Sequence, residues 1–296
     1  MYLFLRLCVR GEYMRASDGH HHISAGNVVP FEKLSLLFGA ADDTGAVRGS
    51  DIVGSNYHNL LAEMTAITEH QWRSGSTRGL VKGFMLSGPP GTGKTTLAKR
   101  LAYELGLRFQ ADNEPPIVLA FVDGGEISRS RYGESEERIR DIFMHARSGF
   151  TAPGQRSVLL FDDVESIFMS RGSQHAKEWH FSQDSVFFHS IDDLDTSRAT
   201  IILTSNRPDL IDEAIRDRFL SYVVDYPDLD TLMQMIQQIP ALQELSGPEK
   251  TSMNNDLFAA VKDGAVRSMR DAQRFALRHF VAKLLKKESM AQRHAD

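Results

Sequence analysis

The sequence predicts an α/β fold, in which five parallel strands form a sheet between layers of helices and a small all-helical domain follows. The composition is that of a globular protein, with 42% hydrophobic and 25% charged residues among 296. From about Asp51 to Asp225, apolar runs alternate with amphipathic helical patterns, as they do where helices connect parallel strands. After Tyr226 and Pro227 the apolar runs stop and only helical patterns continue.

The predicted strands are short, continuous apolar runs that contain many β-branched and aromatic residues. Runs of this kind are typical of strands that are buried on both faces of a sheet. The five strands are expected at 81–86, 117–122, 158–162, 200–204 and 221–225.

Helices are predicted where apolar residues recur at three- and four-residue spacing. In the α/β region they cover 94–105 and 135–147, and Gly106 stands where a C-terminal cap of the first helix is expected. Three more helices follow, at 229–237, 255–262 and 269–287. We therefore predict three regions: a short, partly disordered extension, an α/β domain and a helical lid domain, at 1–47, 48–226 and 227–296.

The net charge and the cysteine content exclude several classes of function. A net charge of −5 gives no support to a protein that coats nucleic acid or an anionic membrane, although a local basic groove is compatible with this total. Cys8 is the single cysteine, which excludes an internal disulfide and a cysteine-based zinc site and fits a reducing cytosol. No apolar run approaches the roughly 20 residues that a membrane-spanning helix needs. We therefore expect a cytoplasmic protein without a membrane partner, and nucleic acid is not the expected partner.

The N-terminal residues contain two patterns that could be mistaken for functional signals. The apolar start MYLFLRLCVR is interrupted by Arg6 and is followed by no small-residue cleavage site, so we do not interpret it as a signal peptide. Our hypothesis is that Met14 is the natural start and that 1–13 is an upstream extension or a tail. The run His20–His22 could suggest metal binding, but no acid or cysteine stands at ligand spacing, so a solvated tail is favoured.

The segment GPPGTGKTT, residues 88–96, matches the phosphate-loop pattern G-x-x-x-x-G-K-[ST]. It follows a predicted strand and opens a predicted helix, which is the context that supports such a match. Its glycines permit a tight turn whose backbone N–H groups converge on phosphate oxygens, and the helix N-terminus adds a positive dipole. We predict that Lys94 reaches the β- and γ-phosphates of ATP and that Thr95 binds Mg²⁺. The nucleotide-binding residues of this P-loop NTPase segment are then Gly88, Pro89, Pro90, Gly91, Thr92, Gly93, Lys94, Thr95 and Thr96.

Two adjacent aspartates end the third predicted strand, in the segment LLFDDVES at 159–166. Asp162 is predicted to hold Mg²⁺ through a water, and Asp163 to orient and polarise the attacking water. The usual second acid is glutamate, so the Asp163 carboxylate is one methylene, roughly 1.5 Å, short, which can cost on the order of 100-fold in rate. Glu165 is not expected to replace it, because it lies beyond the strand end. Two interpretations remain: a slow hydrolase, and a scaffold that binds ATP without hydrolysing it.

Three further segments stand in a fixed order around these motifs: SDIVG at 50–54, SRYGESEERIRDIFMHARS at 130–148 and ILTSNRPDLIDEAIRDRF at 202–219. Together with the phosphate loop and the aspartate pair, they resemble the AAA family of ring-forming ATPases over residues 51–290. The first segment is similar to the one that borders the adenine in this family, which implies that Val53 and Gly54 contact ATP. The second resembles the family's pore-loop segment with its following helix, and the third resembles its second region of homology.

The resemblance implies roles for residues of the third segment. Asn206 matches the sensor residue, whose amide can bond both the γ-phosphate and the attacking water; the alternative is an Asn that caps the helix near Pro208. Arg218, directly before Phe219, matches the arginine finger that reaches a neighbouring subunit's γ-phosphate and raises the rate roughly 10³- to 10⁵-fold. Arg216 departs from the family's usual spacing, so it is either part of the catalytic set or a surface charge. Because an inert scaffold would not need a finger, we favour slow but real hydrolysis.

Two further assignments depart from the family pattern. The family threads substrate with an aromatic-apolar-glycine pore loop, whereas this chain has Arg131, Tyr132 and Gly133. Tyr132 could grip a polypeptide, or it could be an ordinary packed tyrosine. In the helical domain, Arg270 stands where some relatives have a second sensor that faces the nucleotide.

The resemblance implies an ATPase that forms a homo-oligomeric ring, with a hexamer as the expected size. It would remodel or partly unfold a protein partner, with or without an adaptor. Within the family, DDVESI and the short N-terminal region look most like the remodellers of HORMA-domain proteins and their short bacterial relatives. The alternatives are a nucleic-acid-directed ATPase, such as a loader or transposition regulator, and a nucleotide-dependent scaffold. An ATP-dependent protease has no support, since the sequence contains no H-E-x-x-H motif.

Overall fold

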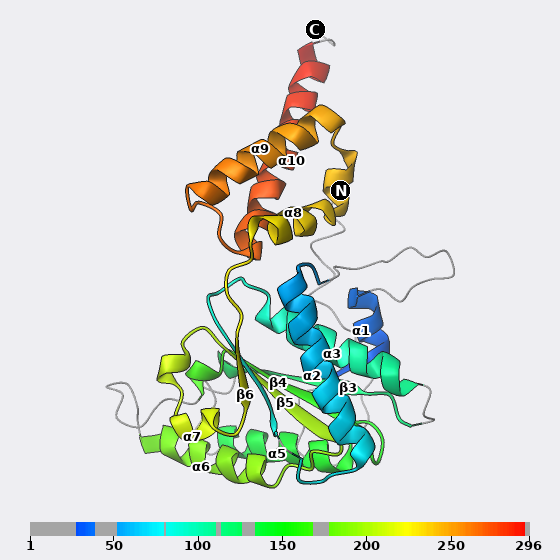
Figure 1. Cartoon of the computed structure of the whole chain (residues 1–296), viewed down its shortest axis with the longest axis vertical. Helices are drawn as coiled ribbons and strands as arrows, with labels where there is room; N and C mark the ends of the chain where they lie inside the picture. The colour runs from blue at the N-terminus through cyan, green and yellow to red at the C-terminus, as the bar shows by residue number, and fades with distance from the viewer. Residues whose placement is uncertain are drawn as a thin grey trace.

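The computed structural model describes residues 28–38, 52–79, 81–110, 114–125, 134–167 and 178–293. Within these ranges a six-stranded sheet carries helices on both faces, and a helical unit adjoins one end of it (Figure 1). The strand order is β1-β3-β4-β5-β2-β6. Five strands pair in parallel: β2 (Gly83–Ser87), β3 (Val118–Asp123), β4 (Ser157–Asp162), β5 (Ala199–Ser205) and β6 (Leu220–Val223). The prediction of a parallel five-stranded sheet between helices is confirmed.

The sixth strand was not predicted. β1 (Val28–Pro30) pairs antiparallel with β3 at the edge of the sheet, with Val28 opposite Ala120. The segment has only three residues, all of them half-buried, so it shows neither the alternation nor the length that marks a strand in a sequence. Its proline has no N–H to donate, which an edge strand tolerates.

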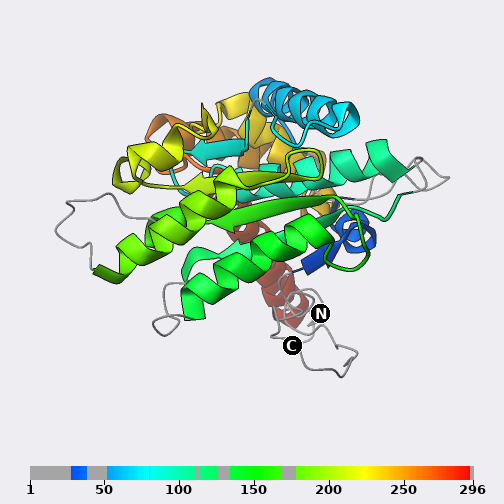
Figure 2. The same ribbon diagram turned by 90° about the horizontal axis from the view of Figure 1, so that it is seen from below.

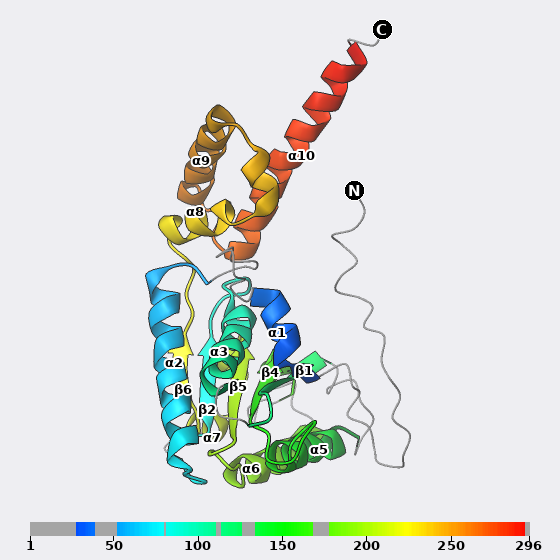
Figure 3. The ribbon, with the colours of Figure 1, turned by 90° about the vertical axis from the view of Figure 1, so that its right-hand side faces the viewer.

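The continuous apolar runs of the strands follow from burial on both faces. In β4, Val158 and Leu160 belong to one core cluster, whereas Leu159 and Phe161 belong to the other, and all four are fully buried. Successive side chains of a strand point to opposite faces, so each layer of helices receives every second residue. The sheet lies between these two layers (Figures 2 and 3).

The two faces are covered by different helices. One core cluster joins the sheet to α1 (Phe31–Phe38), α2 (Ser55–Ser74) and α3 (Lys94–Phe109). The other joins it to α5 (Glu134–Ser148) and α6 (Glu178–Asp192). Short helices follow the strand ends: η3 (Val164–Ser166), η4 (Pro208–Leu210) and α7 (Glu213–Arg216).

The prediction that Gly106 caps the first helix was wrong. α3 continues to Phe109, and Gly106 lies inside it, fully within the core. A Cβ atom at this position would lie 2.1 Å from Cδ2 of Phe31. The glycine therefore allows the ring of Phe31 to pack directly on the α3 backbone, a tertiary contact that overrides the helix-ending tendency of glycine.

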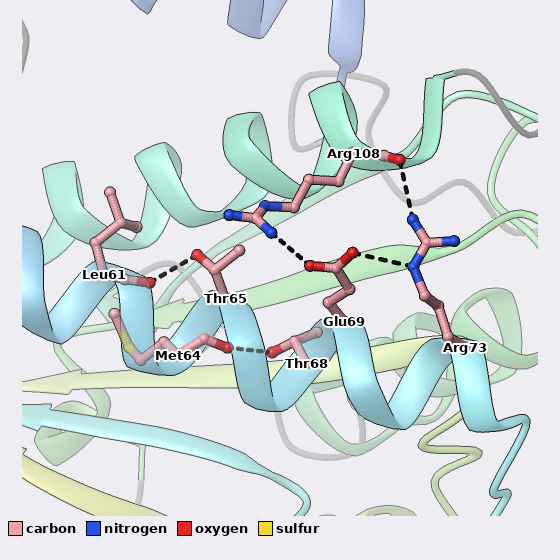
Figure 4. Close-up of polar contacts among 7 residues, drawn as sticks. All are labelled: Leu61, Met64, Thr65, Thr68, Glu69, Arg73 and Arg108. Atoms are coloured by element: carbon pink, nitrogen blue, oxygen red, sulfur yellow. Dashed lines mark hydrogen bonds and ion pairs between the residues drawn. The ribbon is translucent and has the colours of Figure 1, made fainter.

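Polar contacts tie α2 to the C-terminal end of α3 (Figure 4). The Glu69 carboxylate accepts hydrogen bonds from Nε of Arg73 at 3.0 Å and from a guanidinium nitrogen of Arg108 at 2.5 Å. Arg73 also donates to the Arg108 carbonyl at 3.3 Å. On the buried side of α2, the hydroxyls of Thr65 and Thr68 donate to carbonyls one turn earlier, so neither hydroxyl is left unpaired.

The C-terminal unit is helical, as predicted; one of its three predicted helices has the expected bounds and two are longer than expected. It contains α8 (Leu229–Gln237), η5 (Pro240–Glu244), α9 (Gly247–Lys262) and α10 (Met269–Arg293), packed around a separate core that includes Leu232 and Leu257. α9 begins well before the predicted 255, because Ser246 and Glu249 form a capping box. α10 extends beyond α8 and α9 (Figure 3). In the described ranges, no helix combines the length and the apolar character needed to cross a membrane.

Candidate active site

A cavity of about 350 Å³ opens where the carboxyl ends of β2, β4 and β5 meet the helical unit. Ligands of open parallel sheets commonly bind at this edge. Four parts of the chain contribute to its wall: the start of α2, the phosphate loop, the strand ends and the helical unit. The residues are Ile52, Val53, Tyr57, Pro90, Gly91, Gly93, Lys94, Thr95, Thr96, Leu97, Asp162, Asp163, Thr204, Asn206, Met235, Met269, Arg270 and Gln273.

The phosphate loop takes the tight turn that its glycines allow. Gly88, Gly91 and Gly93 have φ angles of 145°, 79° and 95°, a region that other residues rarely adopt. A Cβ on Gly88 would also lie 2.2 Å from the Val224 carbonyl oxygen. α3 begins at Lys94, so its unpaired backbone N–H groups and its positive dipole end face the cavity.

The helical unit touches this loop. A Cβ on Gly91 would lie 2.9 Å from Oγ of Ser268 and 3.1 Å from Cβ of Arg270. Ser268 caps α10, because its hydroxyl accepts from the Asp271 N–H at 3.1 Å. The first turn of α10 therefore rests on the phosphate loop, and Arg270 lines the cavity.

Lys94 is 6% exposed and makes three hydrogen bonds within the chain. Its Nζ donates to the carbonyl oxygens of Gly88 and Pro89 and to Oδ1 of Asn206, each at 2.8 Å. Burial lowers the pKa of Lys94, and the nearby carboxylates of Asp163, Glu165 and Asp162 oppose this shift. The ammonium group therefore lies between the phosphate loop and the acids at the strand ends.

Thr95 and Asp162 form an oxygen-lined corner that fits Mg²⁺. Oγ1 of Thr95 donates to Oδ1 of Asp162 at 2.8 Å, and the Thr204 hydroxyl donates to the same carboxylate oxygen. Mg²⁺ prefers few protein oxygens and completes its shell with water and phosphate. The described residues contain no group of three His, Cys, Asp or Glu side chains that could hold a metal on their own. The oxygen donors of Thr95 and Asp162 are of the kind that Mg²⁺ accepts.

Asp163 has an unusual backbone conformation. With φ 52° and ψ 51° it is the single non-glycine residue with positive φ in the described part of the chain. Its N–H donates to Oγ1 of Thr204 at 3.1 Å, and its Oδ1 accepts from Nδ2 of Asn206 at 2.8 Å. Burial raises the pKa of Asp163, with further contributions from Asp162 and Glu165 and an opposing one from Lys94. Backbone strain of this kind clusters at functional sites.

The structure places Asn206 in the cavity and not in a helix cap. Its side chain links Lys94 to Asp163, with each amide atom in one hydrogen bond. The following helix η4 has Arg207 at its N-cap position and no side-chain cap. The alternative of a capping Asn is therefore wrong.

Several predicted site residues lie away from this cavity. Both guanidinium contacts of Arg218 to Asp192, at 2.8 and 3.0 Å, lie at the end of α6, and its guanidinium stacks 4.9 Å from the Phe188 ring. Arg216 ends α7, and its buried Nε has no hydrogen-bond partner among the described residues. Gly54 meets Thr231 of α8 and does not line the cavity. Gly88, Pro89 and Thr92 form the back of the phosphate loop, where the Thr92 hydroxyl donates to the Pro89 carbonyl at 3.0 Å.

Three predictions fall outside the described residues. They concern the pore loop of Arg131, Tyr132 and Gly133, the start at Met14 and the run His20–His22.

Sequence reasoning missed residues that reach the cavity from separate elements. Thr204 faces inward from β5 and bonds both aspartates. The Tyr57 hydroxyl lies 2.9 Å from the Thr92 carbonyl oxygen and 3.3 Å from that of Asp225. Ile52, Met235 and Met269 add apolar surface on which a planar base could pack. Ile52 and Thr204 lie inside the segments 50–54 and 202–219, whereas no local sequence signal distinguishes Tyr57, Met235 and Met269 from ordinary core residues.

Comparison with known proteins agrees with this geometry. Residues 84–224 match the model of the ATPase family associated with various cellular activities (AAA). The chain is 41% identical over 135 residues to an AAA ATPase forming ring-shaped complexes from Micrococcus luteus, covering 45% of this chain and 23% of that protein. Matches to the curated relatives span from 17% to 37% of their length.

Two solved structures share the fold. The structure of C. elegans PCH-2 aligns with a TM-score of 0.58 and 18% identity, covering 79% of this chain and 70% of that chain. The crystal structure of the FIGL-1 AAA domain in complex with ADP aligns with a TM-score of 0.51 and 21% identity, covering 70% and 65%. Residues 84–224 are therefore similar to the ATPase domain of the AAA family.

Proposed function

We propose that this chain binds ATP with Mg²⁺ and hydrolyses it slowly within a homo-oligomeric ring, and that hydrolysis remodels or partly unfolds a protein partner. The observation that carries the proposal is the continuous set of contacts Lys94–Asn206–Asp163 beside Thr95–Asp162, at the mouth of one cavity. This set brings together a phosphate-binding cation, an amide and two acids. The FIGL-1 domain to which the chain is similar was crystallised with ADP, which supports an adenine nucleotide as the ligand.

In this proposal each side chain has one task. Lys94 and the N–H groups of the phosphate loop bind the phosphates. Thr95 and Asp162 would hold Mg²⁺, which supplies charge neutralisation at the phosphates when it is bound. Asp163 accepts a proton from the attacking water, and Asn206 orients that water and the γ-phosphate. Slow turnover is expected because the Asp163 carboxylate is one methylene shorter than glutamate.

The ring is supported by the position of Arg218. It lies at the end of α6, paired with Asp192 and outside the cavity of its own chain, where a neighbouring subunit could receive it. The Micrococcus relative is named as an ATPase forming ring-shaped complexes. We propose a hexamer in which Arg218 of each subunit contacts the nucleotide of the next, with Arg216 assisting.

Mixing two inactive variants tests this arrangement. Arg218→Ala subunits keep their nucleotide site but lack the finger, whereas Lys94→Ala subunits lack the site but keep the finger. Each variant alone should show little turnover, and an equal mixture should regain about a quarter of the wild-type rate, because about a quarter of random interfaces are complete. Arg198→Ala is the matched control, because Arg198 precedes β5 at the end opposite the cavity. No recovery in mixed rings of normal size would refute a finger acting between subunits.

The protein partner is proposed from the charge and from the chain's relatives. A net charge of −5 does not favour nucleic acid, and one relative is named a proteasome-associated ATPase. Recognition would fall to residues 131–133 in the ring pore or to an adaptor, and the single cysteine is consistent with work in the cytoplasm. Turnover should rise with an unfolded protein and not with single- or double-stranded DNA; stimulation by DNA alone would favour a nucleic-acid-directed ATPase. Capture of partners by the Asp163→Asn variant with ATP would identify the substrate.

A nucleotide-dependent scaffold is the second candidate, favoured by one observation. Asp163 is short, and its Oδ1 is already bonded to Asn206. If the wild type shows no turnover at concentrations where the ring forms, and Asp163→Glu alone restores it, the scaffold describes the protein better.

A further inference from the structure

We infer that Glu165 is a positioning residue, which fixes the main chain of Asn206 and so holds the Asn206 amide between Lys94 and Asp163. The inference rests on the proposed hydrolysis, since the effect on turnover passes through Asn206. It assigns a task to a carboxylate that follows the two aspartates but does not line the cavity.

The turn after β4 sets the direction of Glu165. Asp163 leaves the strand in the left-handed conformation, and the next residues close the short helix η3. The N–H and the hydroxyl of Ser166 both donate to the Asp163 carbonyl, at 3.1 and 2.7 Å. Val164 and Ile167 are fully buried on either side of Glu165. The backbone of Glu165 therefore has little freedom, and its side chain reaches toward the neighbouring strand.

Across the gap between strands, Glu165 supplies the acceptor for Asn206. Oε1 of Glu165 accepts from the Asn206 backbone N–H at 3.0 Å. Asn206 is the first residue after β5, where the parallel ladder with β4 has ended. The next N–H, of Arg207, turns back to Oγ of Ser205 at 3.0 Å. The carboxylate thus fixes the chain at the residue whose side chain must join Lys94 to Asp163.

The second carboxylate oxygen of Glu165 is buried, and Glu165 is not part of the cavity wall. Oε2 is buried and has no hydrogen-bond partner among the described residues. Glu165 therefore differs from Asp163, which lines the cavity. The contact requires an oxygen acceptor on a side chain as long as glutamate. Glutamine has the same length and also carries an acceptor oxygen, but no charge.

Two conservative substitutions separate positioning from a role of the charge. Glu165→Gln keeps the acceptor and removes the charge, whereas Glu165→Asp keeps the charge and withdraws the acceptor by one methylene. For ATP turnover we expect Glu165→Gln to stay within about threefold of the wild type in kcat, and Glu165→Asp to lose about 10- to 100-fold with KM changed less than about threefold. Aspartate equal to or more active than glutamine would overturn the inference.

Hydrogen exchange of the Asn206 amide tests the inference without turnover. In the protein without added nucleotide, this amide should exchange about five- to tenfold faster in Glu165→Asp than in the wild type, and as slowly as the wild type in Glu165→Gln. Equal exchange in the two variants would overturn the inference. If the wild type itself shows no turnover, the proposed hydrolysis fails while the exchange result still decides the role of Glu165.

Discussion

The side chains of Lys94 and Asn206 are joined directly, with Nζ 2.8 Å from Oδ1. Lys94 also donates to two carbonyls of the phosphate loop, so its three donors all have protein acceptors. A phosphate oxygen must therefore replace at least one of these contacts when it binds. If phosphate replaces the contact between Lys94 and Asn206, the Asn206 side chain is released on that side, and its hydrogen bond to Asp163 would change with it.

Asn206→Ala is expected to separate binding from turnover. Removal of the amide frees one donor of Lys94 for phosphate, so the Kd for ATP should stay the same or fall by up to about threefold. The orientation of Asp163 is lost, and kcat should drop about 100-fold. Equilibrium binding of a fluorescent ATP analogue and steady-state phosphate release measure the two effects. A large loss of ATP affinity would contradict this assignment.

Asp163 substitutions should trade stability for rate. Asp163→Glu restores the missing methylene, so kcat should equal or exceed that of the wild type, whereas Asp163→Asn should reduce it at least about 100-fold. Aspartate and asparagine tolerate positive φ better than glutamate does. Asp163→Glu should therefore lower Tm while Asp163→Asn does not. A glutamate variant that is slower than the wild type would show that the left-handed turn has placed the shorter side chain where it is needed.

The raised pKa of Asp163 predicts a pH-dependent cost to folding. Burial, with repulsion from Asp162, makes the charged form less favourable in the folded protein. A folded-state pKa above the unfolded value contributes stability below the unfolded value, and that contribution is lost as the pH rises through the folded pKa. Asp163→Asn should therefore be more stable than the wild type at pH 7, and the difference should shrink as the pH falls and vanish below the ordinary aspartate pKa. The gain should be modest because the carboxylate is partly solvated.

Asp228 is the control with the opposite sign. Its pKa is lowered by hydrogen bonds from the Thr231 side chain and N–H at the start of α8. Asp228→Asn should cost stability at pH 7, and this cost should vanish as the pH falls below the ordinary aspartate pKa. Thermal melting of both variants from about pH 2 to pH 7 checks the pair of predictions, and parallel curves would contradict them.

Tyr57→Phe should loosen the phosphate loop. The Tyr57 hydroxyl contacts the carbonyls of Thr92 and Asp225, and burial, with the charges of Asp228 and Asp225, raises its pKa to about 12. It therefore stays a donor at every working pH. Its removal should cost about 1 kcal/mol in the free energy of unfolding, measured with urea, and weaken ATP binding a few-fold. An unchanged ATP affinity would mean that Tyr57 stabilises the fold but does not contribute to ATP binding.

Two glycines offer a matched pair for the contact between α2 and α8. Gly54 and Gly75 have φ angles of 89° and 66°, so alanine strains the backbone at both. A Cβ at Gly54 would lie 2.5 Å from Oγ1 of Thr231, whereas nothing lies within 4 Å at Gly75. Gly75→Ala should cost about 1 kcal/mol, and Gly54→Ala about 1–3 kcal/mol more. Equal losses in urea unfolding would mean that α8 moves aside freely.

The sequence predicted the elements whose signal is local. β2 to β6 were found to within two residues, because strands buried on both faces must be apolar at every position. β1 was missed because three residues at a sheet edge carry no such requirement. Gly106 was misjudged because its reason, the ring of Phe31, lies far away in the sequence.

The site divides in the same way. The phosphate loop is contiguous, so one pattern identifies all of its residues. Thr204, Tyr57 and Met235 join it only because β5 lies beside β2 and the helical unit covers the cavity. Whether Arg218 and Arg216 act on a second subunit stays a prediction, since the arrangement of one chain cannot contain it. The division of the chain at 47 and at 226 also stays a prediction.

The contact of Gly91 with the first turn of α10 connects the phosphate loop to a long helix. α10 has 25 residues, which at 1.5 Å per residue is about 37 Å. The first turn of α10 contacts the loop that would receive the phosphates, and its C-terminal part extends past the rest of the helical unit (Figure 3). A tilt of about 10° at the loop would move the far end of α10 by about 6 Å. A small change of angle at the phosphate loop would thus become a displacement of several ångström at the C-terminal end of α10.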